Sequence, residues 1–248
     1  AVIDAIKNMD GVPGITGSFS FDDDNNPIKS VAIIELTGGD PFCAEAVGSY
    51  PAPIYLYDSL ESSNLTAKQL ALTGAPHGTL VLTSHQQAGR GRMGRVFESP
   101  AGKGVYLSLL LRPDLSAADA QTVTIGAAVA VARAVKALCG LELGIKWVND
   151  LYYQGKKVCG ILTEAGTDIE SGQVEWLGVG IGLNLTTTPA DWPEELAPTA
   201  GSLFPGGPSP VSRTALAGAI ARELLALCPA FDCLDEYRAR CFVPGHWV

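Results

Sequence analysis

Hydrophobic and polar positions follow two different periods from Tyr55 onward. Short apolar runs bounded by glycine or proline, such as "GTLVLTSHQ" (78–86) and "GVYLSLLLRP" (104–113), predict strands. A long alanine-rich segment (116–138), which opens with serine and aspartate, has an apolar stripe at helical spacing and predicts a buried helix. The pattern indicates strands with helices inserted between them.

Other segments extend this pattern. Residues 60–74 begin with serine and asparagine and then become helical, and residues 212–228 predict a second amphipathic helix. "KWVNDLYYQGKKVCGILTE" (146–164) predicts strands joined by a turn at Gln154-Gly155, and residues 173–185 predict a further strand. Hairpin-linked strands with helices between them predict an α/β (α+β) fold, with a mixed, largely antiparallel sheet flanked by helices.

The first 45 residues differ from this pattern. A short helix (2–9) precedes two strand-like runs around the turn signal "DDDNNP" (22–27). The stretch resembles the C-terminal tail of periplasmic branched-chain amino-acid-binding proteins, and the match is carried by Gly14, Thr16, Gly17, Phe21, Asp22, Asn26, Pro27 and Lys29. We therefore interpret residues 1–45 as an N-terminal extension, a fusion remnant or a gene-model error.

Composition narrows the class of protein. The chain has 248 residues, 47% of them hydrophobic, and a formal net charge of −9, which argues against broad electrostatic binding to nucleic acid. The longest apolar runs fall short of the roughly 20 residues that cross a bilayer, so no membrane span is expected. Six scattered cysteines favour a reducing cytoplasm, and the tail residues Cys228, Cys233, Cys241 and His246 lack the close pairs of a zinc site.

A glycine–arginine loop is the strongest local signal. "GRGRMGRV" (89–96) matches G-x-G-x-x-G, but a dinucleotide site needs a helix directly after the third glycine, and "RVFESPAGKG" (95–104) cannot form one. A protein kinase would also need HRD and DFG motifs, which the chain lacks. Guanidinium groups beside flexible glycines suit an anion clamp, while the alternative is a solvated surface turn.

Two further clusters bear on this choice. Residues 146–164 contain Lys146, Asn149, Asp150, Lys156, Lys157 and Glu164, which are either ordinary hairpin residues or cations and amides for a ligand. In "GVGIGLN" (178–184) the glycines alternate along a strand, which indicates either a bulge or a wall that a ligand approaches closely. Together the clusters supply cations for phosphates and side-chain-free walls for a flat ligand.

The same motifs carry a family resemblance. Residues 55–248 resemble the catalytic domain of biotin–protein ligases through "ESSN" (61–64), "QQAGRGRMGRVFESPAGKGVYLSLLLRP" (86–113), residues 146–164 and residues 178–184, in family order and spacing. Val148 stands where the family usually has proline, and Phe97 where it usually has tryptophan.

The resemblance implies an ATP-dependent ligase. The family activates biotin with ATP to biotinyl-AMP and then acylates one lysine of a biotin carboxyl carrier protein of acetyl-CoA carboxylase or a related carboxylase. Mg²⁺ would be carried with ATP, since the chain shows no protein cage for a metal ion. Because the acyl-adenylate hydrolyses in water, the loop would close over it.

By motif position the resemblance also assigns residues. The catalytic contacts would come from Lys157, Arg92 and Arg90. Biotin would be bound by Ser62, Ser63, Asn64, Gln86, Gly89, Arg90, Lys157, Gly160, Gly180 and Gly182. ATP or the adenylate would be bound by Arg92, Arg95, Phe97, Asn149 and Asn184.

Several alternatives and boundaries complete the expectation. A lipoate or octanoate ligase would carry a different loop, of the R-R-x-(S/T)-G-G-G type, and a non-catalytic remnant of the fold or a solute-binding protein is a further alternative. Residues 1–40 hold seven acidic and two basic residues, so no DNA-reading repressor is expected. We expect a catalytic domain at 50–238, the start of a truncated C-terminal β-domain at 239–248, and a cytoplasmic location; the sequence allows a homodimer.

Overall fold

The computed structural model describes residues 50–168, 170–228 and 230–243, together with three short strands nearer the N-terminus. These strands are β1 (Val12–Gly14), β2 (Gly17–Phe21) and β3 (Pro27–Ile28), and they form an antiparallel sheet in the order β1-β2-β3. The pairing of Phe21 with Pro27 agrees with the predicted hairpin. The helix expected at residues 2–9 lies outside the described residues.

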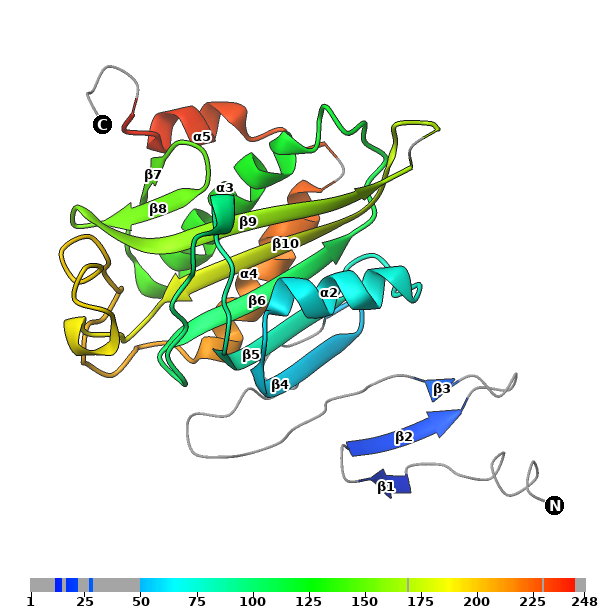
Figure 1. The fold of residues 1–248 in the computed structure, drawn as a ribbon, viewed down its shortest axis with the longest axis horizontal. Coiled ribbons are helices and arrows are strands. Elements are labelled where there is room, and N and C mark those ends of the chain that lie inside the picture. Colours follow the sequence, from blue (N-terminus) through cyan, green and yellow to red (C-terminus); the bar gives the residue numbers. More distant parts are fainter. Residues whose placement is uncertain are drawn as a thin grey trace.

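The main body is built on a seven-stranded sheet in the order β4-β5-β6-β10-β9-β8-β7 (Figure 1). Only β4 and β5 pair in parallel, which confirms the predicted mixed, largely antiparallel sheet. The strands are β4 (Ile54–Leu60), β5 (Leu80–Gln86), β6 (Gly104–Leu111), β7 (Gly144–Lys146), β8 (Asp150–Tyr153), β9 (Lys156–Thr167) and β10 (Val174–Asn184).

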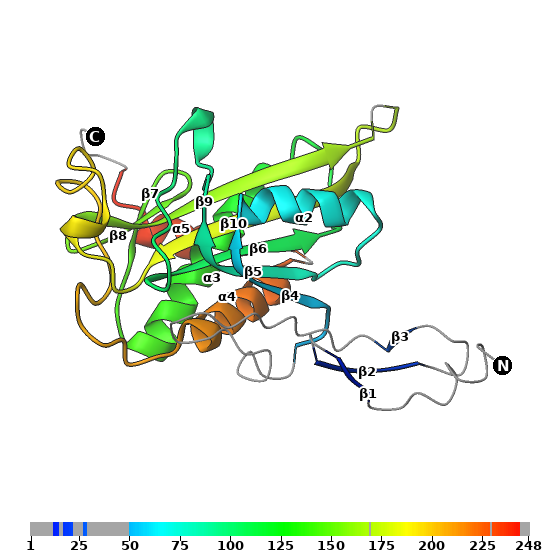
Figure 2. The same ribbon diagram turned by 60° about the horizontal axis from the view of Figure 1, so that its bottom comes forward.

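Helices cover both faces of this sheet. On one face lies α2 (Ser63–Leu72), which contacts β5, β6 and β10, and on the other lie α3 (Gln121–Cys139) and α4 (Arg213–Leu227) (Figure 2). The short helix α5 (Leu234–Arg240) packs against α3 and passes through the domain boundary expected at residue 238. Thus the sheet separates a two-helix core from a face that α2 covers only in part.

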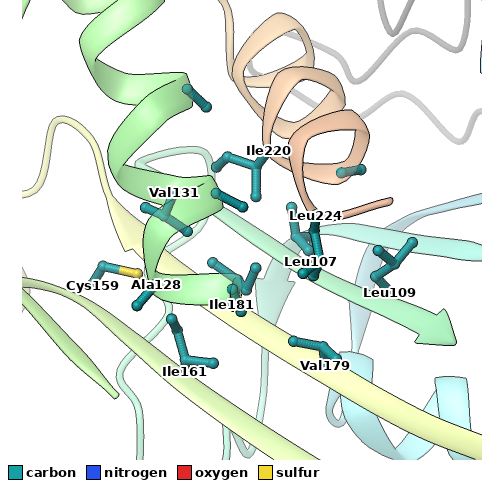
Figure 3. Packing of buried hydrophobic residues seen from close by; sticks show 14 of the residues in the cluster. Leu107, Leu109, Ala128, Val131, Cys159, Ile161, Val179, Ile181, Ile220 and Leu224 are labelled. Carbon is teal, nitrogen blue, oxygen red and sulfur yellow. The ribbon is translucent and has the colours of Figure 1, made fainter. Parts of the chain in front are cut away.

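The core lies between the sheet and the α3–α4 pair, and alternation along the strands decides which side chains enter it (Figure 3). The side chains labelled in Figure 3 are almost fully buried, and burying one leucine, isoleucine or valine side chain contributes about 1.5–3 kcal/mol. The sheet supplies Leu107, Leu109, Cys159, Ile161, Val179 and Ile181, and the helices supply Ala128, Val131, Ile220 and Leu224.

The helix α3 differs from the expectation in two ways. It begins at Gln121, because Ser116 and Asp119 form a hydrogen-bonded turn instead of a helix cap. It is also long and apolar enough, by length and composition, to cross a membrane, which the separate apolar runs of the sequence did not indicate. However, its small alanine and valine side chains are buried against the sheet, as in the core helix of a globular fold.

Candidate functional site

A cavity of about 570 Å³ lies on the α2 side of the sheet, within the size range of small-molecule sites. Its walls come from the N-terminal end of α2, the glycine–arginine loop, the strands β9 and β10, and a segment that follows β10. The lining includes Ser62, Ser63, Asn64, Gln86, Arg90, Arg92, Arg95, Phe97, Asn149, Lys157, Gly160, Gly180, Gly182 and Asn184. Every predicted site residue except Gly89 therefore lines this one cavity.

The glycines of β10 form part of its floor. Since Val179 and Ile181 face the helical core, the alternating Gly180 and Gly182 face the cavity. A Cβ atom at Gly180 would overlap the Asn64 side chain, and one at Gly182 would overlap the Phe97 ring. The structure thus uses this room in part for its own side chains, whereas the sequence predicted that the ligand would take it.

A hydrogen-bond network fixes the polar side chains at the inner end of the cavity. The Gln86 Oε1 atom accepts bonds from the Ser63 backbone N–H (2.9 Å) and hydroxyl (3.1 Å). The buried Ser108 hydroxyl lies 2.6 Å from Asn64 Oδ1 and 2.8 Å from Ser63 Oγ. Because each amide has a defined partner, the donors and acceptors that face the cavity are oriented before any ligand binds.

The glycine–arginine loop forms a hairpin-like excursion between β5 and β6. Its stem closes where the Phe97 N–H donates to the Gly89 carbonyl (2.9 Å), and the Gly91 N–H donates to the Arg95 carbonyl (2.7 Å). A Cβ atom at Gly89 would overlap the Phe97 carbonyl, so glycine is needed there for this closure. At the tip, Met93 has a positive φ of 58° and is 91% exposed. No helix follows the loop before β6, which agrees with the rejection of a dinucleotide fingerprint.

Three cations of the cavity already have partners in the protein. The Lys157 ammonium is 2.7 Å from Asp150 Oδ1, and the Arg90 guanidinium is 3.2 Å from Glu164 Oε1. The Arg92 guanidinium donates to Asn149 Oδ1 (3.1 Å). Their side chains stay partly exposed, so a substrate anion can reach them, and partly exposed pairs of this kind are worth about 0–1 kcal/mol.

The opposite end of the cavity suits a flat, polar ring. Phe97 lies over Gly160 and Gly182, while the buried Trp192 comes from the segment after β10. The Asn184 Nδ2 donates to the Gly201 carbonyl (2.9 Å), but its buried Oδ1 has no hydrogen-bond partner among the residues that the structure describes. An unpaired buried acceptor is costly, so a ligand N–H group is the natural partner for Asn184 Oδ1.

The segment after β10 is hydrogen-bonded to the start of β9. The Lys157 N–H donates to the Thr199 carbonyl (2.9 Å), and the Gly201 N–H donates to the Lys157 carbonyl (2.8 Å). Asp191 accepts from Lys103 and from Thr188; burial acts against ionisation, but these hydrogen bonds lower the pKa of Asp191 below its usual value. This ionised carboxylate ties the segment to the end of the glycine–arginine loop.

Buried groups near the site are held in their neutral forms. Burial raises the pKa of the Cys159 thiol, which lies on the core side of β9, so this cysteine does not supply a thiolate nucleophile. Burial also raises the pKa of Tyr106, whose hydroxyl donates to the Pro100 carbonyl (3.0 Å). The described residues contain no cluster of three His, Cys, Asp or Glu side chains that could hold a metal ion.

Sequence reasoning assigned no specific role to three residues of this region. Ser108 is a lone hydroxyl within the apolar run "VYLSLLL", and that contrast was a usable signal. Trp192 gave no comparable signal because it lies in an irregular segment. Glu164 stood in a quoted motif, but its contact with Arg90 is not visible in the sequence.

Comparison with known proteins identifies the class of fold and then the family. The fold matches a biotin protein ligase from Aquifex aeolicus, solved in complex with biotin and ATP, with a TM-score of 0.61, 24% identity and coverage of 77% of this chain and 78% of that chain. A biotin protein ligase from Leishmania major, solved with biotin, matches with a TM-score of 0.64, 22% identity and coverage of 80% and 84%. Residues 56–184 match the Biotin/lipoate A/B protein ligase family, and the chain belongs to it.

Curated relatives carry the names of biotin ligases. The "Bifunctional ligase/repressor BirA" of Bacillus subtilis is 43% identical over 169 residues, which cover 68% of this chain and 50% of the relative. The "Biotin--[acetyl-CoA-carboxylase] ligase" of Mycobacterium tuberculosis is 33% identical over 197 residues, covering 75% and 70%. The chain spans about half the length of its Bacillus relatives. The predicted membership of the biotin ligase family is confirmed; the resemblance of residues 1–45 to a binding-protein tail stays a prediction.

Proposed function

We propose that this chain is a biotin–protein ligase. In the first step, a carboxylate oxygen of biotin bonds to the α-phosphorus of ATP and pyrophosphate leaves. In the second, a lysine amine of a biotin carboxyl carrier protein attacks the acyl carbon of biotinyl-AMP, AMP leaves and the amine loses a proton. The observation that carries the proposal is the convergence of Lys157, Arg90 and Arg92 on one cavity with a glycine floor.

The residues divide the work between the two ends of the cavity. The oriented groups of Ser63, Asn64 and Gln86 suit the ureido ring of biotin, and the unpaired Asn184 Oδ1 with the Phe97 ring suits adenine. Lys157 would neutralise the carboxylate and the α-phosphate as charge develops. Mg²⁺ would enter on the triphosphate of ATP and offset its charge.

Lipoate transfer is the nearest rival because the family includes lipoate ligases. The G-R-G-R loop and the biotin-ligase names of the curated relatives favour biotin. We further propose a carrier domain of acetyl-CoA carboxylase or a related carboxylase as partner, a cytoplasmic location, and no DNA-binding activity.

The test is direct. The protein is incubated with ATP, Mg²⁺, biotin and a biotin carboxyl carrier domain, and the carrier is weighed by intact mass spectrometry. Addition of one biotin supports the ligase. Transfer of lipoate but not of biotin would favour the rival, and no ATP-dependent product with either acid would reject an active ligase.

A further inference from the structure

Glu164 contacts two parts of the site that come from different elements. On β9 it lies opposite Gly178 and on the same face as Gly160, toward α2 and the loop. Its Oε1 atom pairs with the Arg90 guanidinium (3.2 Å), and its Oε2 atom accepts from Asn64 Nδ2 (2.9 Å). One carboxylate therefore links the stem of the glycine–arginine loop to the inner end of the cavity.

This contact completes the orientation of Asn64. Its Nδ2 also donates to the Leu162 carbonyl (3.1 Å), and its Oδ1 faces the Ser108 hydroxyl (2.6 Å). Asn64 is 4% exposed, so an unpaired amide hydrogen there would be costly. With Glu164 in place, the amide has one favourable orientation.

The second contact fixes Arg90. Its side chain is half exposed, and in the described part of the chain Glu164 is the carboxylate paired with it. A long exposed arginine samples many rotamers, and pairing with a half-buried carboxylate selects among them. In the selected position the guanidinium contacts the same carboxylate that Asn64 contacts.

We propose that Glu164 is a positioning residue that couples biotin binding at Asn64 to closure of the glycine–arginine loop through Arg90. This inference rests on the proposed function, since it names the biotin-binding end of that same cavity. When Glu164 contacts both Arg90 and Asn64, the glycine–arginine loop and the inner end of the cavity are held in a fixed relative position. If Glu164 lost its charge but kept a side-chain oxygen, Asn64 would still have a hydrogen-bond acceptor, but Arg90 would lose its ion-pair partner.

The variant Glu164→Gln separates these two contacts because glutamine retains an oxygen acceptor for Asn64 and removes the negative charge that faces Arg90. We expect roughly fivefold weaker biotin binding by calorimetry, as for loss of one partly exposed ion pair. We also expect trypsin to cut the loop after Arg92 and Arg95 roughly fivefold faster, since protection follows the stability of the closed loop. Glu175→Gln, an exposed residue on β10 outside the cavity, is the matched control and should change neither rate nor affinity.

A double-mutant cycle distinguishes positioning from general damage. In an Arg90→Ala background, Glu164→Gln should have little further effect, because the two residues act as a pair. Equal binding and equal cleavage in wild type and Glu164→Gln, or fully additive effects in the cycle, would overturn the inference. If Glu164→Gln does not fold, Arg90→Ala removes the same ion pair from the loop side. Trypsin should then cut this variant after Arg92 faster than it cuts wild type.

The two proposals fail in different ways. Wild-type protein that binds no biotin would remove the proposed function, while the cleavage rates of the same variants still decide whether Glu164 holds the loop. If the wild-type protein binds biotin but Glu164→Gln changes neither the affinity nor the cleavage rate, the proposed function stands and the positioning role of Glu164 is rejected.

Discussion

Lys157 has a partner before any substrate arrives. Its ammonium pairs with Asp150, and its backbone is bonded on both sides to residues 199–201. The charge is therefore held in place by the fold, so little reorganisation is needed when a phosphate approaches. A substrate anion has only to displace the partly exposed Asp150 carboxylate from the Lys157 ammonium, or to bind the ammonium beside it.

Replacement of Lys157 by alanine should abolish adenylation and leave the fold intact. Removing one preorganised cation at a reacting phosphate costs at least about 100-fold in rate. Pyrophosphate release with biotin and ATP is the measurement, and thermal unfolding checks the fold. The neighbouring Lys156→Ala is the matched control, because Lys156 is exposed, lies outside the cavity and donates to the Ala197 carbonyl. An active Lys157→Ala would remove this residue from the mechanism.

The variant Arg92→Gly should leak the intermediate. Arg92 bonds to Asn149 across the cavity mouth, and its loss removes the contact that holds the loop tip to that side. Retention of biotinyl-AMP after gel filtration is expected to fall roughly tenfold, equivalent to about 1.4 kcal/mol. Retention equal to that of wild type would contradict a closing role for Arg92.

Two glycines of β10 should respond differently to the same methyl group. Gly182→Ala would push Phe97 away from its position over the strand, and we expect roughly tenfold weaker ATP binding. At Gly178 the nearest side-chain atom is 3.8 Å from the added Cβ, so Gly178→Ala should be tolerated. Calorimetric titration with ATP compares the two, and equal losses would show that Phe97 does not matter.

The sequence motifs indicated which residues share a cavity but not how they contact one another. Arg90, Asn64 and Lys157 come from three separate motifs and line the same cavity, while their roles in binding and catalysis stay predictions. The link from Glu164 to Asn64 joins positions 100 residues apart, and it depends on both the register of β9 on β10 and the packing of α2 on the sheet. Likewise, no local pattern shows that the room over Gly182 is taken by Phe97.

Among the elements, hairpins were predicted better than helix starts. The turn at Gln154-Gly155 has φ values of 49° and 76°, which suit a tight hairpin, and its polar–glycine pair announced it. The start of α3 was predicted too early, because serine and aspartate serve turns and helix caps equally well. The helix α5 was not predicted, since its seven residues carry too short a pattern.

α5 is fastened to α3 by a charged cluster that should make stability depend on pH. Hydrogen bonds from Arg133 above all, and also from Arg240, lower the pKa of Glu236 below its usual 4.5, although burial opposes them. The stabilisation is therefore fully present above about pH 5 and is lost as pH falls through the lowered pKa.

The variant Glu236→Gln tests this cluster. At pH 7 it should lower the free energy of unfolding by about 1 kcal/mol, and the gap to wild type should close on acidification below pH 4. Urea unfolding at several pH values gives the comparison. Asp235→Asn, whose side chain is fully exposed, is the control. A pH-independent gap would show that packing, not charge, holds α5.

At the scale of the whole molecule, the two faces of the sheet differ in function: one holds the main core and the other holds the cavity. The α3–α4 face holds the main core, and the α2 face holds the cavity with its cations, within a chain of net charge −9. Local concentration of arginine and lysine matters for an anion more than the total charge does, because screening limits long-range effects to about 10 Å.

A chain that lacks residues 1–49 should keep both the core and the cavity. The seven-stranded sheet, its helices and the cavity are built from residues 50–243. Removal of residues 1–49 is therefore expected to change the melting temperature by less than about 4 °C, the effect of 1 kcal/mol or less. Calorimetry and the carrier biotinylation assay measure the outcome. Loss of folding would show that the N-terminal residues belong to the domain.

The alternation along β10 also limits how this protein can change in evolution. Val179 and Ile181 point to the core while Gly180 and Gly182 point to the cavity. Deleting one residue within the strand would exchange the two sets, placing branched side chains in the cavity and glycine where the core needs volume. Insertions and deletions within β10 should therefore not be tolerated. Among relatives, differences in length are expected in the loops that connect β10 to its neighbours.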